Sequence, residues 1–139
     1  MYLLDTNVIS ELQKGERCHR AVSAWYRSVG DSEKFLSVVV VGEIRQGIER
    51  VRPRDPRRAA SFERWLGTLL QSFSDRIIPI DIATAQVWGR INAASPMPVI
   101  DSLLAATAIA HRLTLVTRDV SDTARSGVAA FNPFEYPVN

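Results

Sequence analysis

The sequence predicts an α/β domain with a central, mostly parallel β-sheet flanked by helices on both faces. Short apolar runs alternate along the chain with segments whose apolar residues recur at helical spacing. One run, FLSVVVV at residues 35–41, is apolar almost throughout, which is typical of a strand buried on both faces. A chain of 139 residues with 46% hydrophobic and 23% charged residues suits one domain with a real core, so we assign residues 1–139 to a single domain.

The first half of the chain alternates in this way from its start. Strands are predicted where the residues are apolar or β-branched, and helices where apolar residues such as Val22, Trp25 and Val29 share one face. We expect strands at 2–4 and 35–41 and helices at 8–12, 19–29, 42–51 and 56–73.

The second half continues the pattern with shorter runs. The segment IIPID, residues 77–81, is predicted to be a strand, and its internal Pro79 indicates a position at or near the sheet edge. We expect helices at 83–93 and 99–112, a strand at 113–117 and a short fifth strand at 128–133.

Composition narrows the cellular setting and the class of partner. The single Cys18 cannot form an internal disulfide, and no apolar run reaches the length of about 18 residues expected of a membrane-spanning helix. The N-terminus lacks a signal-peptide pattern, so we expect a cytoplasmic protein without a membrane partner. A net charge of +2 and a pI of about 9.0 permit a nucleic-acid partner without requiring one.

Acidic residues fall where the predicted strands end. Asp5 follows the first strand, Glu43 lies in the first turn after the second, and Asp119 comes two residues after LTLVT. Asp101 heads a helix that is otherwise small and apolar. Taken alone, Asp5 and Asp101 are also compatible with helix capping. Because ligands of parallel α/β sheets bind outside the carboxyl ends of the strands, we expect the four side chains to meet there.

Carboxylates that meet at one edge repel one another unless a cation lies between them. Mg²⁺ and Mn²⁺ prefer hard oxygen ligands, and a carboxylate site with open water positions suits phosphate chemistry. Zinc is disfavoured, because His19, His111 and Cys18 have no zinc-ligand spacing. The acids therefore indicate a Mg²⁺ (or Mn²⁺) site.

Basic residues are concentrated between residues 45 and 64. A solvated pair of helix ends around the Pro53 and Pro56 turn explains this as well as a phosphate-binding surface does. Both interpretations stay open for this cluster: Arg45, Arg50, Arg52, Arg54, Arg57, Arg58 and Arg64.

The motifs together resemble the PIN-domain ribonucleases of the VapC toxin type, and more narrowly their FitB-like branch. The resemblance rests on LLDTNVISEL, SVVVVGEIRQGI, IDSLLAATAIAHRLTLVTRD and AFNPFEY, in that order over essentially the whole chain. It implies a single PIN-like domain. It also implies that Asp5, Glu43, Asp101 and Asp119 form a catalytic, metal-binding site. Asp122 is a rival for the fourth position, because TRDVSDT offers both acids.

Polar neighbours of these acids look like groups that orient carboxylates or metal-bound water. The resemblance suggests this role for Thr6, Asn7 and Thr117, whereas for Ser37 an ordinary cap is the better interpretation. Arg118 and Arg45 are candidates for contacts with RNA phosphates.

The implied function is metal-dependent hydrolysis of RNA phosphodiesters by an endoribonuclease toxin. The implied partners are an RNA substrate, a cognate VapB-like antitoxin with its own DNA-binding domain, and a second copy of the chain in a homodimer, with a heterotetramer or larger assembly once the antitoxin binds. The alternative is a FitB-like non-catalytic or weakly catalytic partner of a DNA-binding antitoxin that acts in transcriptional regulation.

A phosphatase of the aspartyl-phosphate type is the other class that begins with a strand ending in Asp. Such an enzyme needs a second Asp two residues on and a well-placed Lys. This chain has Asn7 there and only Lys14 and Lys34 in total, which argues against that class.

Overall fold

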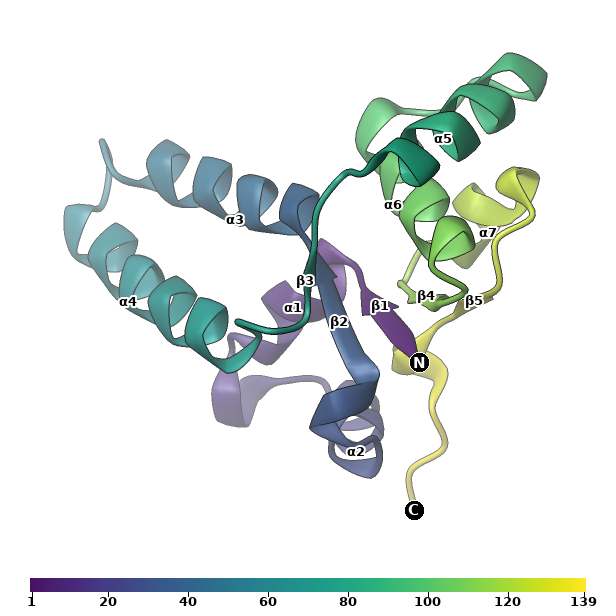
Figure 1. The fold of residues 1–139 in the computed structure, drawn as a ribbon. Helices are drawn as coiled ribbons and strands as arrows, with labels where there is room; N and C mark the ends of the chain where they lie inside the picture. Colours follow the sequence, from purple (N-terminus) through teal and green to yellow (C-terminus); the bar gives the residue numbers. More distant parts are fainter.

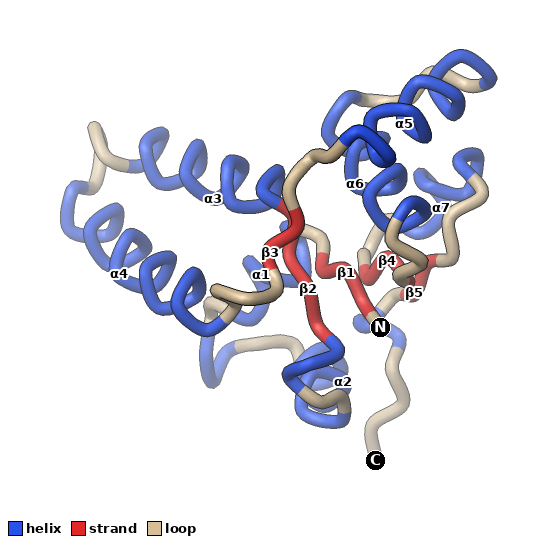
Figure 2. The backbone as a smooth tube through the Cα atoms, in the orientation of Figure 1, coloured by secondary structure: helices blue, strands red, loops and turns tan.

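The computed structural model describes residues 1–139 and contains one five-stranded sheet in the order β3-β2-β1-β4-β5. Every neighbouring pair of strands runs parallel, so the predicted mostly parallel sheet is entirely parallel. Figure 2 shows the strands at the centre of the molecule with helices around them. The strands are β1 (Tyr2–Leu4), β2 (Lys34–Ser37), β3 (Ile77–Ile78), β4 (Thr114–Val116) and β5 (Ala130–Phe131).

The helices form two groups around this sheet. In Figure 1 the α3–α4 hairpin projects to one side of the central strands, and the packed pair α5 and α6 lies on the other. None of the helices combines the length and apolar character needed to cross a membrane. The helices are α1 (Thr6–Leu12), α2 (Arg20–Ser28), α3 (Val38–Val51), α4 (Pro56–Ser72), α5 (Ile82–Ala94), α6 (Val99–Ala110) and α7 (Val120–Thr123).

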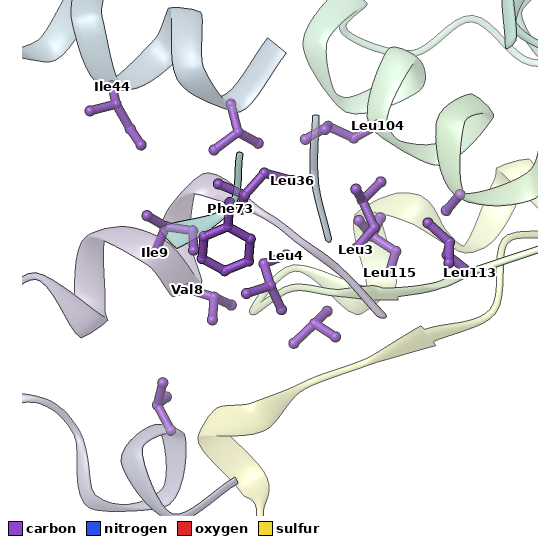
Figure 3. Packing of buried hydrophobic residues seen from close by; sticks show 14 of the residues in the cluster. Leu3, Leu4, Val8, Ile9, Leu36, Ile44, Phe73, Leu104, Leu113 and Leu115 are labelled. Atoms are coloured by element: carbon purple, nitrogen blue, oxygen red, sulfur yellow. The ribbon is translucent and has the colours of Figure 1, made fainter. Parts of the chain in front are cut away.

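The core lies on both faces of β1. Leu3 and Leu4 point to opposite faces because side chains alternate along a strand, yet both are fully buried. Figure 3 shows Leu3 toward Leu104 of α6 and Leu4 toward Val8 of α1. Cover on both faces explains why the β1 residues before Asp5 are apolar without alternation.

The predicted second strand is wrong in its second half. Residues 38–41 begin α3, because the Ser37 hydroxyl accepts a hydrogen bond from the Val39 N–H (3.1 Å) and caps a helix there. Valine favours strands only weakly, and the fully buried Val40 lies against the core from within the helix. As a consequence Glu43 lies in the second turn of α3, not in the first turn after the strand.

The sheet edges agree with the sequence. β3 is an edge strand, as Pro79 predicted, but it comprises only Ile77–Ile78. β5 forms the opposite edge. The sequence did not predict α7 or the single 3₁₀ turns η1 (Gly15–Arg17), η2 (Asp31–Glu33), η3 (Ala124–Ser126) and η4 (Pro133–Glu135). These segments are too short to show a hydrophobic period.

Candidate active site

Asp5 lies directly after β1 at the carboxyl edge of the sheet. Its backbone N–H donates to the Val116 carbonyl at the end of β4 (2.9 Å), which fixes its backbone against the neighbouring strand. Its Oδ1 atom accepts from the Thr6 N–H (2.6 Å) and caps α1. Its Oδ2 atom makes different contacts, so a capping role and a site role for Asp5 are compatible with each other.

Thr117 joins the acids that follow β1 and β4. Its fully buried hydroxyl donates to Asp5 Oδ2 (2.8 Å) and accepts from the Asp119 N–H (3.1 Å). Asn7 reinforces this connection, because its Nδ2 donates to Asp119 Oδ2 (3.2 Å) and to Thr117 Oγ1 (3.3 Å). Asp5 and Asp119 are thus held by one network through the side chains of Asn7 and Thr117.

Thr6 connects Asp5 to Glu43. Its N–H donates to Asp5, and its hydroxyl donates to Glu43 Oε1. Glu43 is 37 positions away from Thr6 in the chain, so this contact exists only because α3 returns past the start of α1. Thr6, Asn7 and Thr117 therefore contact acidic residues, whereas Ser37 caps α3.

Asp101 and Asp122 share a hollow of about 280 Å³ between α6 and α7. Asp101 is the third residue of α6, where the helix dipole favours a negative charge. Even so, burial raises the pKa of the Asp101 carboxyl above its ordinary value, and repulsion from Asp119 and Asp122 raises it further. Both rival acids therefore act on the Asp101 carboxyl, and Asp122 also shares its hollow. The sequence did not single out Arg125, which lines the same hollow.

The carboxylates at this edge of the sheet repel one another. Burial raises the pKa of Asp5 more than hydrogen bonds from Thr117 and Thr6 lower it, and repulsion from Glu43 and Asp101 acts in the same direction as burial. No salt bridge joins a basic side chain to any of these carboxylates. The carboxylates therefore have no ion-pair partner within the protein, although Arg125 lines the hollow of Asp101 and Asp122.

The donors present fit a divalent ion in their chemistry. The site offers carboxylate oxygens with hydroxyl and amide groups behind them, and Mg²⁺ and Mn²⁺ prefer oxygen ligands. No three acidic, His or Cys side chains are already drawn together as a coordination sphere. To hold one ion together, the carboxylates would have to lie closer to one another than they do here.

The two arginines predicted to contact nucleic acid lie in different settings. Arg45 Nη1 is bonded to Glu49 (3.1 Å) and Glu63 (2.5 Å), within a surface network that also contains Arg52. Hydrogen bonds from Arg52 and Arg45 lower the pKa of Glu49 to about 2. The guanidinium of Arg118 forms no ion pair and no hydrogen bond within the protein, and its backbone N–H donates to Asn7 Oδ1 (3.2 Å). Of the two, only Arg118 is both adjacent to the acids and free to bind phosphate.

A groove leads away from Glu43 between α1, α3 and α4, and we call it the α1–α3–α4 groove. It has a volume of about 220 Å³ and joins a basic hollow of about 710 Å³, with Gln13 and Phe62 lining both. The helical spacing of Phe62 and Trp65 predicts an apolar helix face, but it does not predict that they line a groove. The groove is lined by Thr6, Ser10, Gln13, Glu43, Ile44, Gly47, Ile48, Phe62 and Trp65, and the basic hollow by Gln13, Lys14, Arg17, Arg58 and Phe62.

A parallel sheet with acids at its carboxyl edge defines the class of fold and site. The chain belongs to the PIN domain family, whose family model matches residues 2–121. Within that family it is similar to the VapC ribonuclease Y4jK of Sinorhizobium fredii, at 34% identity over 97% of this chain and 99% of the relative. It is also 34% identical to the toxin FitB of Neisseria gonorrhoeae, over 96% of this chain and 99% of that one. A solved structure of FitAB bound to an IR36 DNA fragment superimposes with a TM-score of 0.88 at 30% identity, covering 100% of this chain and 99% of the other.

Proposed function

We propose that this protein is a metal-dependent endoribonuclease toxin of the VapC type. The observation that carries the proposal is the group of carboxylates gathered at the carboxyl edge of the sheet without a basic partner. Two full-length relatives named VapC ribonuclease and toxin FitB support the same class. In this proposal Asp5, Glu43, Asp101 and Asp119 hold Mg²⁺ or Mn²⁺.

When bound, the ion supplies a water of lowered pKa and neutralises charge on the phosphate oxygens. The side chains around it hold the carboxylates in position. Thr117 and the Thr6 N–H fix the two oxygens of Asp5, and the Thr6 hydroxyl fixes Glu43. We prefer Asp119 to Asp122 as the fourth ligand, because Asn7 and Thr117 tie Asp119 to Asp5. Asp122 remains the second candidate, since it shares the hollow of Asp101.

The decisive experiment is cleavage of a mixed pool of structured RNAs by the purified protein free of any partner. We expect cutting with Mg²⁺ or Mn²⁺, none with EDTA, and a loss of more than about 100-fold in Asp5→Asn and in Asp101→Asn. Asp75→Asn is the matched control, because its side chain is 81% exposed and it precedes β3, whereas the acids lie at the carboxyl edge of the parallel sheet. Circular dichroism confirms that each variant is folded. Cutting that survives in both site variants would sink the proposal.

The fourth ligand is tested in the same assay. Asp119→Asn should lose more activity than Asp122→Asn if the network through Asn7 marks the ligand. The opposite order would assign the position to Asp122.

The runner-up function is a non-catalytic partner in transcriptional regulation. The similarity to FitAB bound to DNA is the observation that favours it. Calorimetric titration with Mn²⁺ separates the two functions, because it reads metal binding without turnover. A folded protein that binds Mn²⁺ through Asp5 and Asp101 but cuts no RNA in the pool supports the runner-up.

We further propose that a VapB-like antitoxin with a DNA-binding domain docks on this chain, and that the complex contains a homodimer of it. The α1–α3–α4 groove suits an apolar antitoxin segment, because Ile44, Ile48 and Phe62 line it beside Glu43. Its two ends differ in charge: Glu43 lies at one and the basic hollow of Lys14, Arg17 and Arg58 at the other. A segment with a basic residue near Glu43 and acidic residues at the far end complements both.

Filling the groove tests this docking site. Ser10→Arg places a long side chain in the groove from an exposed position, and we expect it to abolish co-purification with a co-expressed VapB-like antitoxin. Ser72→Arg makes the same change at an exposed position outside the groove and should leave co-purification intact. Retention of the partner by Ser10→Arg would place the antitoxin elsewhere.

A further inference from the structure

A second hollow lies next to the acidic site, on the far side of α7, and we call it the β5 hollow. It has a volume of about 620 Å³ and is lined by Arg118, Val120, Ser121, Ala130, Phe131, Asn132 and Glu135. Ser121 also lines the hollow that contains Asp101 and Asp122, so the two spaces meet at this residue. Figure 1 shows α7 on the same side of the molecule as α6 and β5, both of which it contacts. The β5 hollow is therefore adjacent to the hollow of Asp101 and Asp122.

The lining combines apolar side chains with polar groups that have no partner within the protein. Val120, Ala130 and Phe131 provide apolar surface of the kind on which a nucleobase packs its face. Asn132 Oδ1 accepts from the Phe134 N–H (2.9 Å), which leaves the side-chain NH₂ of Asn132 without an acceptor. The Glu135 carboxylate forms neither a salt bridge nor a hydrogen bond.

Arg118 is held in place at the rim of the β5 hollow. Its guanidinium carbon lies 4.4 Å from the centroid of the Phe134 ring, which is itself packed edge-on against His19. Stacking on an aromatic ring fixes the planar group while its N–H donors stay unused. A fixed guanidinium with unused donors is suited to bind a phosphate.

We propose that the β5 hollow binds a guanine nucleotide of the RNA, next to the phosphodiester that the acidic site cleaves. This inference rests on the proposed ribonuclease function and deepens it by naming the base. The Watson–Crick edge of guanine presents one acceptor, O6, followed by two donors, N1–H and N2–H. Asn132 offers an NH₂ donor for O6, and Glu135 offers two carboxylate oxygens for the adjacent donors. Adenine, cytosine and uracil do not present that order, so the two side chains select guanine.

The test measures binding without cleavage. Fluorescence anisotropy in EDTA compares two labelled single-stranded RNA hexamers that differ only in one central base, guanine or adenine. We expect the guanine hexamer to bind at least about tenfold tighter, as one bidentate contact can provide. Glu135→Gln should reduce that preference to less than about threefold, because an amide has one acceptor oxygen in place of two. Glu16→Gln removes the same charge at an exposed position on η1 and should keep the preference.

Each outcome separates this inference from the ribonuclease proposal. Equal binding of the two hexamers, binding of neither, or a preference unchanged in Glu135→Gln overturns the guanine site, even if metal-dependent cleavage is found. A guanine preference that depends on Glu135 supports the site, even if no RNA is cut. Free guanosine 5′-monophosphate that binds as tightly as the hexamer would show a site for free nucleotides and would also overturn the inference.

Discussion

Replacing Thr117 with valine tests the network that holds Asp5 and Asp119. The two side chains have the same shape, so the change removes a hydroxyl and leaves the packing of this fully buried residue intact. Asp5 loses a donor at 2.8 Å, the Asp119 N–H loses its acceptor at 3.1 Å, and Asn7 Nδ2 loses one of its three acceptors, at 3.3 Å. We expect a loss of stability together with a weaker metal site.

The size of the expected stability loss follows from the hydrogen-bond partners that no longer have the Thr117 hydroxyl. A hydrogen bond to an ionised carboxylate contributes about 1.5 to 3 kcal/mol to the free energy of unfolding. A methyl group in place of the hydroxyl recovers up to about 0.8 kcal/mol by burial. The Asp119 N–H adds little, because Asp119 is exposed and water can replace its acceptor. The expected net loss is about 1 to 2 kcal/mol.

Urea unfolding in EDTA measures this loss, and Thr107→Val is the matched control. Thr107 is also fully buried, but its hydroxyl donates to the Leu103 carbonyl within α6 (2.7 Å), so its removal should cost less than about 0.5 kcal/mol. A second measurement reads the site. Because Thr117 lowers the pKa of Asp5, its removal raises that pKa further, and Mn²⁺ binding should need a higher pH. Equal stability losses in Thr117→Val and Thr107→Val would refute the reasoning.

Three further predictions concern charge and helix stability. Burial raises the pKa of Asp5 and Asp101, so the stability that their carboxyls contribute is fully present below their unfolded-state pKa of about 4 and is lost as pH rises through the folded-state values. The double variant Asp5→Asn plus Asp101→Asn should therefore gain stability over the wild type, and this gain, measured by unfolding in EDTA, should grow from pH 4 to pH 7. A gain that stays constant with pH would contradict this prediction. Lys34 is 1% exposed, and its Nζ lies 3.5 Å from the Tyr26 ring centroid. Lys34→Met keeps the buried volume and should change the free energy of unfolding by less than about 1 kcal/mol, whereas Lys34→Ala should lower it by about 2 to 4 kcal/mol. Equal losses in the two variants would show that the charge of Lys34 matters more than its volume. Gly67→Ala should stabilise α4 by about 0.5 to 1 kcal/mol in thermal unfolding, since an added Cβ meets no atom within 4 Å, and a loss would contradict the open space seen there.

The pattern of apolar residues predicted most of the fold. It failed at residues 38–41, where a strand-like run of valines follows the helix-capping Ser37. Parallel strands and the edge position of β3 followed from local composition and Pro79. Residues 38–41 read as a strand, because a run of valines has no helical period of its own. Capping by Ser37 and burial of Val40 against the core decide that this run is helical. The cap is a local contact between residues two positions apart, whereas the burial of Val40 is a tertiary effect that local propensity does not contain.

The sequence by itself placed Asp5 and Asp119 after strands and Asp101 at a helix start, because strand ends and small apolar helices are visible as local patterns, but it misplaced Glu43, which lies in the second turn of α3. It also determined that Asp5 follows a buried strand. Only the tertiary structure decided that Thr6 bonds to Glu43 across 37 positions and that Asn7 bonds to Asp119 across 112. It likewise decided that Arg45 is tied to Glu63 while Arg118 stays free. Such contacts depend on where distant segments of the chain meet, and a sequence period reports only the neighbours of each residue along its own helix or strand.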